Sequence, residues 1–444
     1  MKTKNQLLQL LALAALPAAA LATNGDNLIA IGPIARGMGG LSVAYPQDPI
    51  SAVFANPAAM CFGPYCPVSE MNLSITAFMP DVEASVTDST GAKVAASSDD
   101  KVYLIPAIGF SHPLKFDEQD RWRIGMSAYG VSGLGVDYKD SAINSIFTGT
   151  GTGPTNPPIP FVPGNPWTGA GLKTELMIAK VAPAIAYKVL PNLSVGGSIH
   201  LNYSELEIFD RKSDGTTLGF QIGGLYTPVP NVYIGASYTS PQTIKYDSII
   251  PAGQPPAPPA YNALKLEAPQ QIAAGISTEL LDKRLVLGIE ARWINWGDAD
   301  GYSDFGWKDQ YVIALGGQYA VMPEKFIVRA GYNFGNNPVD ENNGFDGSFS
   351  PTGMPNDVVT VQGTPFPRYY YETFRIIGFP AIVEHHVTLG ASWFFKENIS
   401  VNFAYMHAFE NTIRESGTSP LGTPTTIEST LLENSIEIGF SWRF

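Results

Sequence analysis

Few side chains in this sequence have the types and spacing that chemistry needs. The histidines show no catalytic spacing with a serine and an acid, so they do not indicate a hydrolase. They are His112, His200, His385, His386 and His407. His385 and His386 begin a predicted strand, in which neighbouring side chains point to opposite faces, and this argues against a shared metal site. We therefore expect no enzyme activity, no cofactor and no metal.

The two cysteines, Cys61 and Cys66, stand close together on either side of Gly63 and Pro64. In an oxidising compartment they could close a small loop. A zinc site would need more ligands, and no other Cys or His lies nearby. We expect a disulfide between them rather than two free thiols.

Three charged residues fall at inward positions of alternating runs, where they could meet the head group of a ligand. They are Glu290, Arg292 and Arg329. They could also pair with one another in a structural network, which is the favoured interpretation. A carboxylate substrate would benefit from Arg292, Arg329 or the N-terminal Arg36, whereas a neutral hydrocarbon would not.

The elements that must position these residues are alternating strands. About fourteen runs are expected, at residues 69–79, 101–112, 121–130, 174–188, 193–200, 217–227, 232–238, 264–279, 285–293, 307–320, 326–334, 386–395, 399–405 and 435–444. Short turns alternate with long Gly/Pro/Asn-rich segments at 130–171, 246–262, 335–380 and 411–430. Short turns at one end and long loops at the other are typical of a transmembrane barrel with an even strand number.

Alternation also assigns faces, because charges facing lipid cost about 2–4 kcal/mol at the membrane midplane. In the last run, Ile436, Ile438, Phe440 and Trp442 are expected to face lipid and Glu437 the lumen. The terminal Phe444 resembles the signal that barrel assembly machinery reads. Aromatic residues near strand ends are expected to form interfacial girdles; these are Trp293, Trp296, Tyr319, Tyr332, Trp393 and Trp442.

The N-terminus and the composition agree with an exported barrel. Lys2 and Lys4, an apolar run at 7–16 and a small-residue site at 20–22 predict a signal peptide at residues 1–22. That run is shorter than the roughly 20 residues of a membrane helix. Only 15% of the 444 residues are charged, against about 25% in ordinary soluble proteins. The net charge of −13 argues against nucleic-acid binding.

Residues 23–66 precede the first strand and lack a long alternating run. Their short apolar patches need burial, and the segment is too small to form a core alone. The natural place for it is the lumen of the barrel, as a plug. We therefore expect a plug at 23–66 and an all-β, 14-stranded antiparallel transmembrane barrel at 67–444.

The sequence resembles the FadL family of outer-membrane transporters for hydrophobic compounds, which includes fatty acid and aromatic hydrocarbon transporters. The resemblance covers essentially the whole mature chain. It rests on Ala35-Arg36-Gly37-Met38-Gly39-Gly40, Ala44-Tyr45-Pro46-Gln47-Asp48, Phe54-Ala55-Asn56-Pro57-Ala58, Trp293-Ile294-Asn295-Trp296, Val387-Thr388-Leu389-Gly390-Ala391-Ser392 and the aromatic C-terminus.

The resemblance implies a monomeric barrel closed by an N-terminal hatch that contains Asn56, Pro57 and Ala58. It also implies a luminal ligand site that the mature N-terminus contacts, and a lateral opening in the third strand, here near Gly130, Gly133 and Gly135. The luminal candidates are Thr23, Asn24, Arg36, Met38, Phe54, Arg292 and Arg329. The fatty acid transporters place a long capture loop where this chain has the short segment 208–216, so Phe147, Phe161 and Trp167 become the capture candidates.

We therefore predict passive uptake of hydrophobic small molecules, either long-chain fatty acids or hydrocarbons, with lateral release into the bacterial outer membrane. The expected partners are the substrate, outer-membrane lipid and the barrel assembly machinery. The alternative is a general or selective porin for polar solutes, although a plug would block bulk diffusion. A surface adhesin is favoured only by the long loops.

Overall fold

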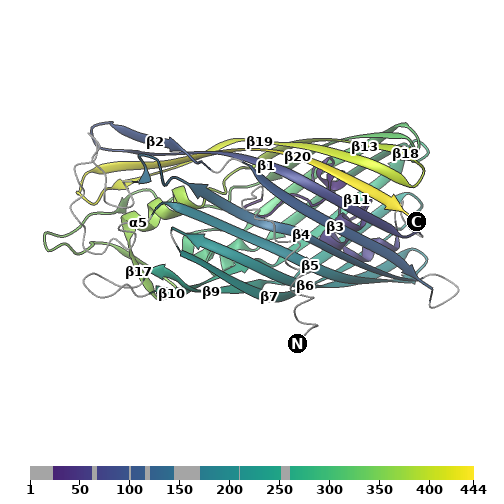
Figure 1. Cartoon of the computed structure of the whole chain (residues 1–444), viewed down its shortest axis with the longest axis horizontal. Coiled ribbons are helices and arrows are strands. Elements are labelled where there is room, and N and C mark those ends of the chain that lie inside the picture. The colour runs from purple at the N-terminus through teal and green to yellow at the C-terminus, as the bar shows by residue number, and fades with distance from the viewer. Residues whose placement is uncertain are drawn as a thin grey trace.

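A computed structural model describes residues 24–62, 68–99, 102–115, 121–144, 171–209, 211–251 and 261–444. Within these residues, fourteen strands close into an antiparallel barrel, which confirms the predicted fold class (Figure 1). They are β1 (Glu70–Thr87), β3 (Tyr103–Leu114), β4 (Trp122–Asp137), β5 (Lys173–Leu190), β6 (Leu193–Ile208), β7 (Arg211–Tyr226), β8 (Val232–Thr239), β11 (Gln271–Leu280), β12 (Leu285–Ile294), β13 (Gln310–Met322), β14 (Phe326–Gly335), β18 (His385–Lys396), β19 (Ile399–Thr418) and β20 (Pro424–Arg443).

The remaining elements are short and lie in the connections or inside the ring. The strands are β2 (Lys93–Ser97), β9 (Gln242–Pro251), β10 (Tyr261–Ala268), β15 (Phe345–Asp346), β16 (Val358–Val361) and β17 (Thr364–Pro367). The helices are α2 (Pro33–Arg36), α3 (Pro49–Ala55), η1 (Pro57–Cys61), η2 (Trp296–Asp298), η3 (Ser303–Phe305), α5 (Arg368–Thr373) and η4 (Phe374–Gly378). None of the helices in the described residues is long and apolar enough to cross a membrane.

The first and last strands close the barrel along their whole length. β1 pairs with β20 from Glu70 opposite Arg443 to Thr87 opposite Thr426. Beyond β20, the backbone amide and carbonyl of Phe444 bond to Ser69 at 3.0 and 3.2 Å. Closure removes the free edges that an open sheet would expose to lipid.

The two ends of the barrel differ in their connections. Short turns join β5 to β6, β11 to β12, β13 to β14 and β18 to β19 at the end near the C-terminus, whereas α5, β2, β10 and β17 gather at the other end (Figure 1). This asymmetry matches the periplasmic and extracellular ends of outer-membrane barrels. We call these the turn end and the loop end.

Several strands run beyond their predicted bounds: β6 continues to Ile208 and β7 begins at Arg211, so little remains of the short segment expected at 208–216. Two further departures change the pattern of elements. The expected loop at 411–430 is wrong, because β19 continues to Thr418 and β20 begins at Pro424. In this stretch Ile413 and Ile427 point inward and are buried, while Arg414 and Glu428 pair on the outside. Outside the membrane the apolar face turns to the packed interior, so the alternation inverts and no longer resembles a lipid-facing strand.

The predicted single strand at 264–279 is also wrong. Residues 261–268 form β10, which pairs with β9 in a hairpin outside the barrel ring, and the barrel strand β11 begins only at Gln271. Pro269 lies between them, where it interrupts the ladder because proline has no backbone N–H.

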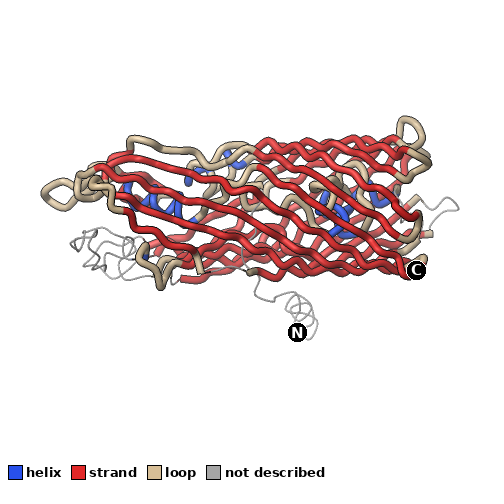
Figure 2. The backbone as a smooth tube through the Cα atoms, turned by 90° about the horizontal axis from the view of Figure 1, so that it is seen from above, coloured by secondary structure: helices blue, strands red, loops and turns tan. Residues whose placement is uncertain are grey.

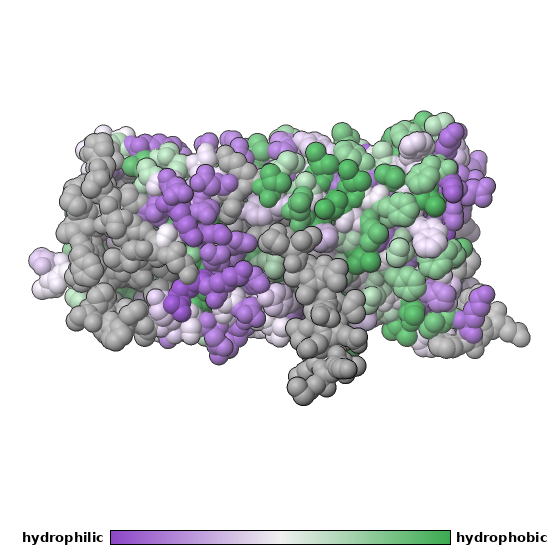
Figure 3. All heavy atoms as spheres, viewed as in Figure 1, coloured by the Kyte–Doolittle hydropathy of each residue, from purple (hydrophilic) through white to green (hydrophobic). Residues whose placement is uncertain are grey.

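The outer surface carries the expected apolar belt, which Figure 3 shows over the half of the barrel nearer the turn end. On β20, Ile438 is 53% exposed and the adjacent Glu437 is 1% exposed. The same alternation of exposed and buried residues runs along β12 and the first part of β19. Trp296 is the exception: it is fully buried in the interior rather than placed in an outer girdle.

Residues 24–62, which we call the luminal segment, lie inside the ring of strands, where Figure 2 shows its helices. Asp48 caps α3 by accepting a hydrogen bond from the backbone amide of Ser51 at 2.8 Å. Glycines on the strands give the segment room: a Cβ at Gly235 would stand 2.3 Å from the Val43 carbonyl, and one at Gly331 would stand 2.1 Å from the Gly39 nitrogen. Such distances would exclude any larger residue.

Candidate ligand-binding site in the lumen

A small cavity of about 50 Å³ lies between the luminal segment and one side of the barrel wall. Its lining comes from the luminal segment, from strands β4 to β12, and from Pro269 between β10 and β11. The residues are Asn27, Leu28, Phe54, Ala55, Tyr129, Val131, Ile178, Lys180, His200, Asn202, Gln221, Ser237, Thr239, Gln242, Ala268, Pro269, Gln271, Ala273 and Arg292.

One wall of the cavity is apolar. Leu28 and Phe54 come from the luminal segment, and Tyr129, Val131 and Ile178 come from β4 and β5. The rings of Phe54 and Tyr129 meet edge to face, with their centres 5.6 Å apart. This wall suits the hydrocarbon part of a ligand.

The rest of the lining is largely polar and includes a buried lysine, Lys180 of β5. The Lys180 Nζ lies 3.1 Å from His200 Nδ1, and His200 Nε2 lies 3.0 Å from the Ser198 hydroxyl. Among the described residues Lys180 forms no ion pair with a carboxylate. A buried ammonium that only neutral groups contact favours an anionic ligand atom.

Arg292 is the second cation of the cavity. Its guanidinium carbon lies 6.0 Å from the centre of the Phe54 ring, and it forms no hydrogen bond or ion pair with another described residue. The adjacent inward carboxylate is already engaged, because Glu290 Oε1 accepts the backbone amides of Ser42, Val43 and Ala44 at 2.8, 2.6 and 3.2 Å. Glu290 thus holds the luminal segment, and Arg292 faces the cavity.

The expected mutual pairing of Glu290, Arg292 and Arg329 is met only in part, because Glu290 and Arg292 attract each other without a hydrogen bond and Arg329 lies apart. Arg329 donates to Gln318 Oε1 at 3.1 Å and to the Ser392 hydroxyl at 2.6 Å, away from the other two. Glu290 instead accepts hydrogen bonds from backbone amides of the luminal segment. Strand alternation could not reveal these partners.

Most of the other luminal candidates lie elsewhere in the segment. Arg36 is fully buried, with Nε 2.7 Å from Glu437 Oε2 and Nη2 2.9 Å from the Ala30 carbonyl. Met38 packs with Leu41 against β12 and β13. Asn24 is buried beside Gly335 on β14. None of these three lines the cavity, so only Phe54 and Arg292 of the described candidates do.

Sequence reasoning did not single out Lys180, His200 or Tyr129 as site residues. Lys180 and His200 stand at inward positions of predicted strands, so the alternation that revealed Arg292 would have found them too. Tyr129 could not be found this way, because its role depends on Phe54 of the luminal segment.

The Asn56-Pro57-Ala58 motif fastens the segment to the wall. The Asn56 side-chain amide donates to the carbonyls of Val43 and Gly224 at 2.8 and 3.0 Å, and its oxygen accepts the Ala58 amide at 3.2 Å. The Ser194 hydroxyl donates to the Ala58 carbonyl at 2.7 Å. One amide side chain thus joins the segment to itself and to β7.

The third barrel strand, β4, parts from one of its neighbours beside the cavity. Its pairing with β3 ends at Tyr129 opposite Ala107, whereas its pairing with β5 continues to Asp137 with a register shift between Gly130 and Ser132. Gly133 and Gly135 belong to this singly paired stretch. The Leu28 amide of the luminal segment donates to the Val131 carbonyl at 3.4 Å, where the partner strand is missing.

Several predicted residues lie outside the described part of the chain. These are Thr23, Cys66, Phe147, Phe161 and Trp167. Cys61 is buried at the end of η1. The disulfide and the capture loop stay predictions.

A closed antiparallel barrel with an apolar belt and a filled lumen defines a class of transmembrane β-barrel. A family model described as outer membrane protein transport protein (OMPP1/FadL/TodX) matches residues 204–344. No curated protein matches the chain in sequence. The family match over residues 204–344 supports the predicted resemblance to the FadL family, and the closed barrel is the architecture expected of an outer-membrane protein.

Solved structures share the fold at low sequence identity. The toluene transporter TodX of Pseudomonas putida is 16% identical, with a TM-score of 0.63 over 95% of this chain and 100% of that one. The toluene transporter TbuX of Ralstonia pickettii is 16% identical, with a TM-score of 0.62 over 95% and 99%. A FadL homologue of Pseudomonas aeruginosa is 16% identical, with a TM-score of 0.62 over 96% and 100%.

Proposed function

We propose that this protein takes up hydrophobic small molecules passively across the outer membrane, and that the luminal cavity binds them on the way. The observation that carries the proposal is the position of the cavity, with an apolar wall beside the stretch of β4 that has lost its β3 partner. The family match supports the same function. Two of the similar structures, TodX and TbuX, are toluene transporters.

The physics of such a route needs no energy source. An apolar solute gains about 25 cal/mol for each Å² that it removes from water, so a series of apolar contacts can carry it inward. The gap beside β4 would let the solute leave sideways into lipid, where it is most soluble. The luminal segment would act as the plug that blocks a straight aqueous path. A monomeric state and insertion by the barrel assembly machinery remain predictions.

Lys180 and Arg292 favour an amphiphile with an anionic head group over a neutral hydrocarbon. Both face the cavity: Lys180 forms no ion pair among the described residues, and Arg292 has only a longer-range attraction to Glu290. A carboxylate placed between them would gain charge-assisted hydrogen bonds, while its chain lies on Phe54 and Tyr129. Long-chain fatty acids have this chemistry.

Uptake into proteoliposomes tests the proposal. Wild-type protein should transport a labelled fatty acid and a labelled toluene-like solute, but not sugars. The double variant Lys180→Ala/Arg292→Ala should slow acid uptake by about tenfold or more, the loss expected for a charge-assisted contact, and leave the hydrocarbon rate within about twofold. Arg414→Ala is the matched control, because Arg414 is a cation outside the lumen.

Either of two results would contradict the proposal. Swelling of the liposomes in sugars at porin-like rates would favour the porin alternative. Equal loss of acid and hydrocarbon uptake in the double variant would show that the two cations do not select the head group.

A further inference from the structure

Three uncharged polar side chains that line the luminal cavity stand in one row across three strands. Gln221 of β7 lies opposite Thr239 of β8, and Thr239 lies opposite Gln271 of β11. Residues directly opposite each other on antiparallel strands have Cβ atoms about 4.5–5.5 Å apart, so the three side chains are neighbours. We call Gln221, Thr239 and Gln271 the polar row.

The polar row has hydrogen-bonding groups that the protein does not use. The Gln221 side-chain amide donates to the carbonyls of Phe54 and Ala55 at 3.0 and 3.1 Å. These two bonds fix which end of the amide is the nitrogen, and the buried amide oxygen has no hydrogen-bond partner among the described residues. The Thr239 hydroxyl and the Gln271 amide form no hydrogen bond with another described residue either.

Two other amides of the cavity lining are satisfied by the protein. Asn202 donates to Gln242 Oε1 at 2.8 Å, and the Gln242 nitrogen donates to the Ser240 carbonyl at 2.9 Å. Buried polar groups of folded proteins are nearly all paired with protein or water. The unused groups of the polar row are therefore available to a bound molecule.

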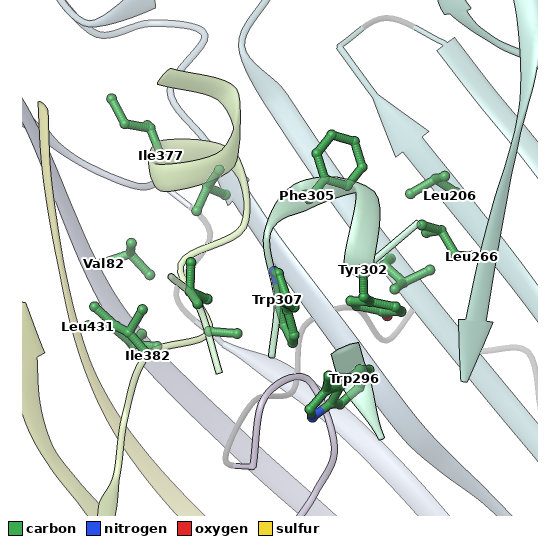
Figure 4. Packing of buried hydrophobic residues seen from close by; sticks show 14 of the residues in the cluster. Val82, Leu206, Leu266, Trp296, Tyr302, Phe305, Trp307, Ile377, Ile382 and Leu431 are labelled. Atoms are coloured by element: carbon green, nitrogen blue, oxygen red, sulfur yellow. The ribbon is translucent and has the colours of Figure 1, made fainter. Parts of the chain in front are cut away.

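Apolar packing bounds the polar row toward the loop end. There, buried side chains of β10 and of the β12–β13 connection fill the interior, including Leu266, Tyr302 and Phe305 (Figure 4). The cavity itself, at about 50 Å³, exceeds the roughly 10–15 Å³ that one water molecule needs. Its size therefore suits the head group of a ligand, a few atoms large.

Cations stand on both sides of the polar row. On one side, His200 is the diagonal neighbour of Gln221 and its Nδ1 lies 3.1 Å from the Lys180 ammonium. On the other side, Arg292 is the diagonal neighbour of Gln271. Diagonal neighbours are about 7–8 Å apart, within reach of long side chains. A carboxylate held by either cation would thus place its first few carbon atoms beside the polar row.

We propose that the luminal cavity selects hydroxylated acids, in which a hydroxyl within a few carbons of the carboxylate bonds to the polar row. The Gln221 oxygen can only accept a hydrogen bond, so the ligand has to supply a donor, and a carboxylate has none. A hydroxyl supplies that donor and can also accept from the Thr239 hydroxyl or the Gln271 amide. The inference rests on the proposed function and names the preferred substrate class of the same site.

Binding to the full chain in lipid nanodiscs tests the inference. The probes are octanoate, 3-hydroxyoctanoate and 1-octanol, and empty nanodiscs correct for partition into lipid. We expect 3-hydroxyoctanoate to bind about tenfold or more tighter than either other probe, since each of those leaves a buried group without a partner. The double variant Gln221→Met/Thr239→Val, which preserves side-chain size, should bring the two acids within about twofold of each other. Gln318→Met is the matched control and should keep the preference, because Gln318 accepts from Arg329 and does not line the cavity.

The measured quantity is the ratio of two affinities, so a general weakening of the site does not imitate the expected result. If the double variant does not fold, Gln271→Leu tests the other end of the polar row and should lower the ratio by about threefold or more. Equal binding of 3-hydroxyoctanoate and either other probe by the wild type, or an unchanged ratio in the variants, would overturn the inference. Persistent uptake of octanoate and toluene-like solutes in that case would leave the proposed function standing, whereas absence of all hydrophobic uptake would remove the proposed function itself.

Discussion

At the scale of single residues, β20 carries two buried glutamates that differ in their hydrogen bonds. Glu437 of β20 accepts from Arg36 at 2.7 Å and from the Ser74 hydroxyl at 2.8 Å. Glu433 lies four residues earlier on the same face of β20 and is fully buried. Neither of its carboxyl oxygens has a hydrogen-bond partner among the described residues. Removing one partner of a buried ion pair leaves the other charge uncompensated and destabilises the fold, whereas a buried acid without a partner leaves no such charge behind when it is replaced.

This contrast gives a prediction for a matched pair of variants. Glu437→Gln leaves the buried Arg36 without its counter-charge and should lower the free energy of unfolding by about 3–5 kcal/mol. Glu433→Gln removes no partner and should leave it unchanged or raise it by about 1 kcal/mol. Urea unfolding in lipid vesicles, followed by tryptophan fluorescence, measures both. A larger loss for Glu433→Gln than for Glu437→Gln would contradict the assignment of partners.

At the scale of elements, the interrupted pairing of β3 and β4 is joined to the luminal segment by one backbone hydrogen bond. The Leu28 amide donates to the carbonyl of Val131, which lies at the register shift of β4, just beyond its last pair with β3. Movement of the start of the segment would therefore uncover the same stretch of β4. The element that fills the lumen and the proposed lateral opening in β4 are coupled through this contact.

A reversible crosslink tests the coupling. In a Cys61→Ser/Cys66→Ser background, the pair Leu28→Cys/Val131→Cys should form a disulfide. Residues 28 and 131 are joined by a backbone hydrogen bond, and this brings them close enough for a disulfide. Fatty acid uptake into proteoliposomes should fall by about tenfold or more when the pair is oxidised and recover on reduction. The Leu28→Cys single variant controls for the substitution itself. Full uptake by the oxidised pair would mean that the segment need not move at this point.

At the scale of the whole molecule, the barrel and the luminal segment are held together by different interactions. Hydrogen bonds between neighbouring strands close the ring, and β20 joins β1 independently of the segment. The segment is held by side chains such as Glu290 and Asn56 and by the space that glycines leave. The ring should therefore persist without the segment.

Deletion of residues 24–62 should leave a folded barrel that has lost selectivity. We expect the deletion variant to run on gels as a heat-modifiable barrel and to let sugars into liposomes, whereas the wild type excludes them. Glu290→Ala, which removes the acceptor of three segment amides, should leak less than the deletion. A deletion variant that folds and still excludes sugars would show that the segment is not the plug.

The sequence determined the parts of this protein that depend on local pattern. Period-two alternation distinguishes lipid from lumen along a strand, so the barrel, its strand number and the inward Arg292 and Arg329 follow from residue order alone. The pattern failed at β19 and β20 beyond the membrane, where the apolar side turns inward, and at Trp296, which is drawn into the interior by Tyr302 and Trp307.

Only the tertiary structure decided which inward residues form the site. Arg36, Arg292 and Arg329 look alike in sequence, but Glu437 neutralises the first, Gln318 and Ser392 engage the third, and only Arg292 faces the cavity. The reason is physical. The partner of an inward side chain is a residue of the luminal segment or of another strand of the barrel. Such residues are far apart in sequence, so closure of the ring brings them together and the neighbours in the chain do not.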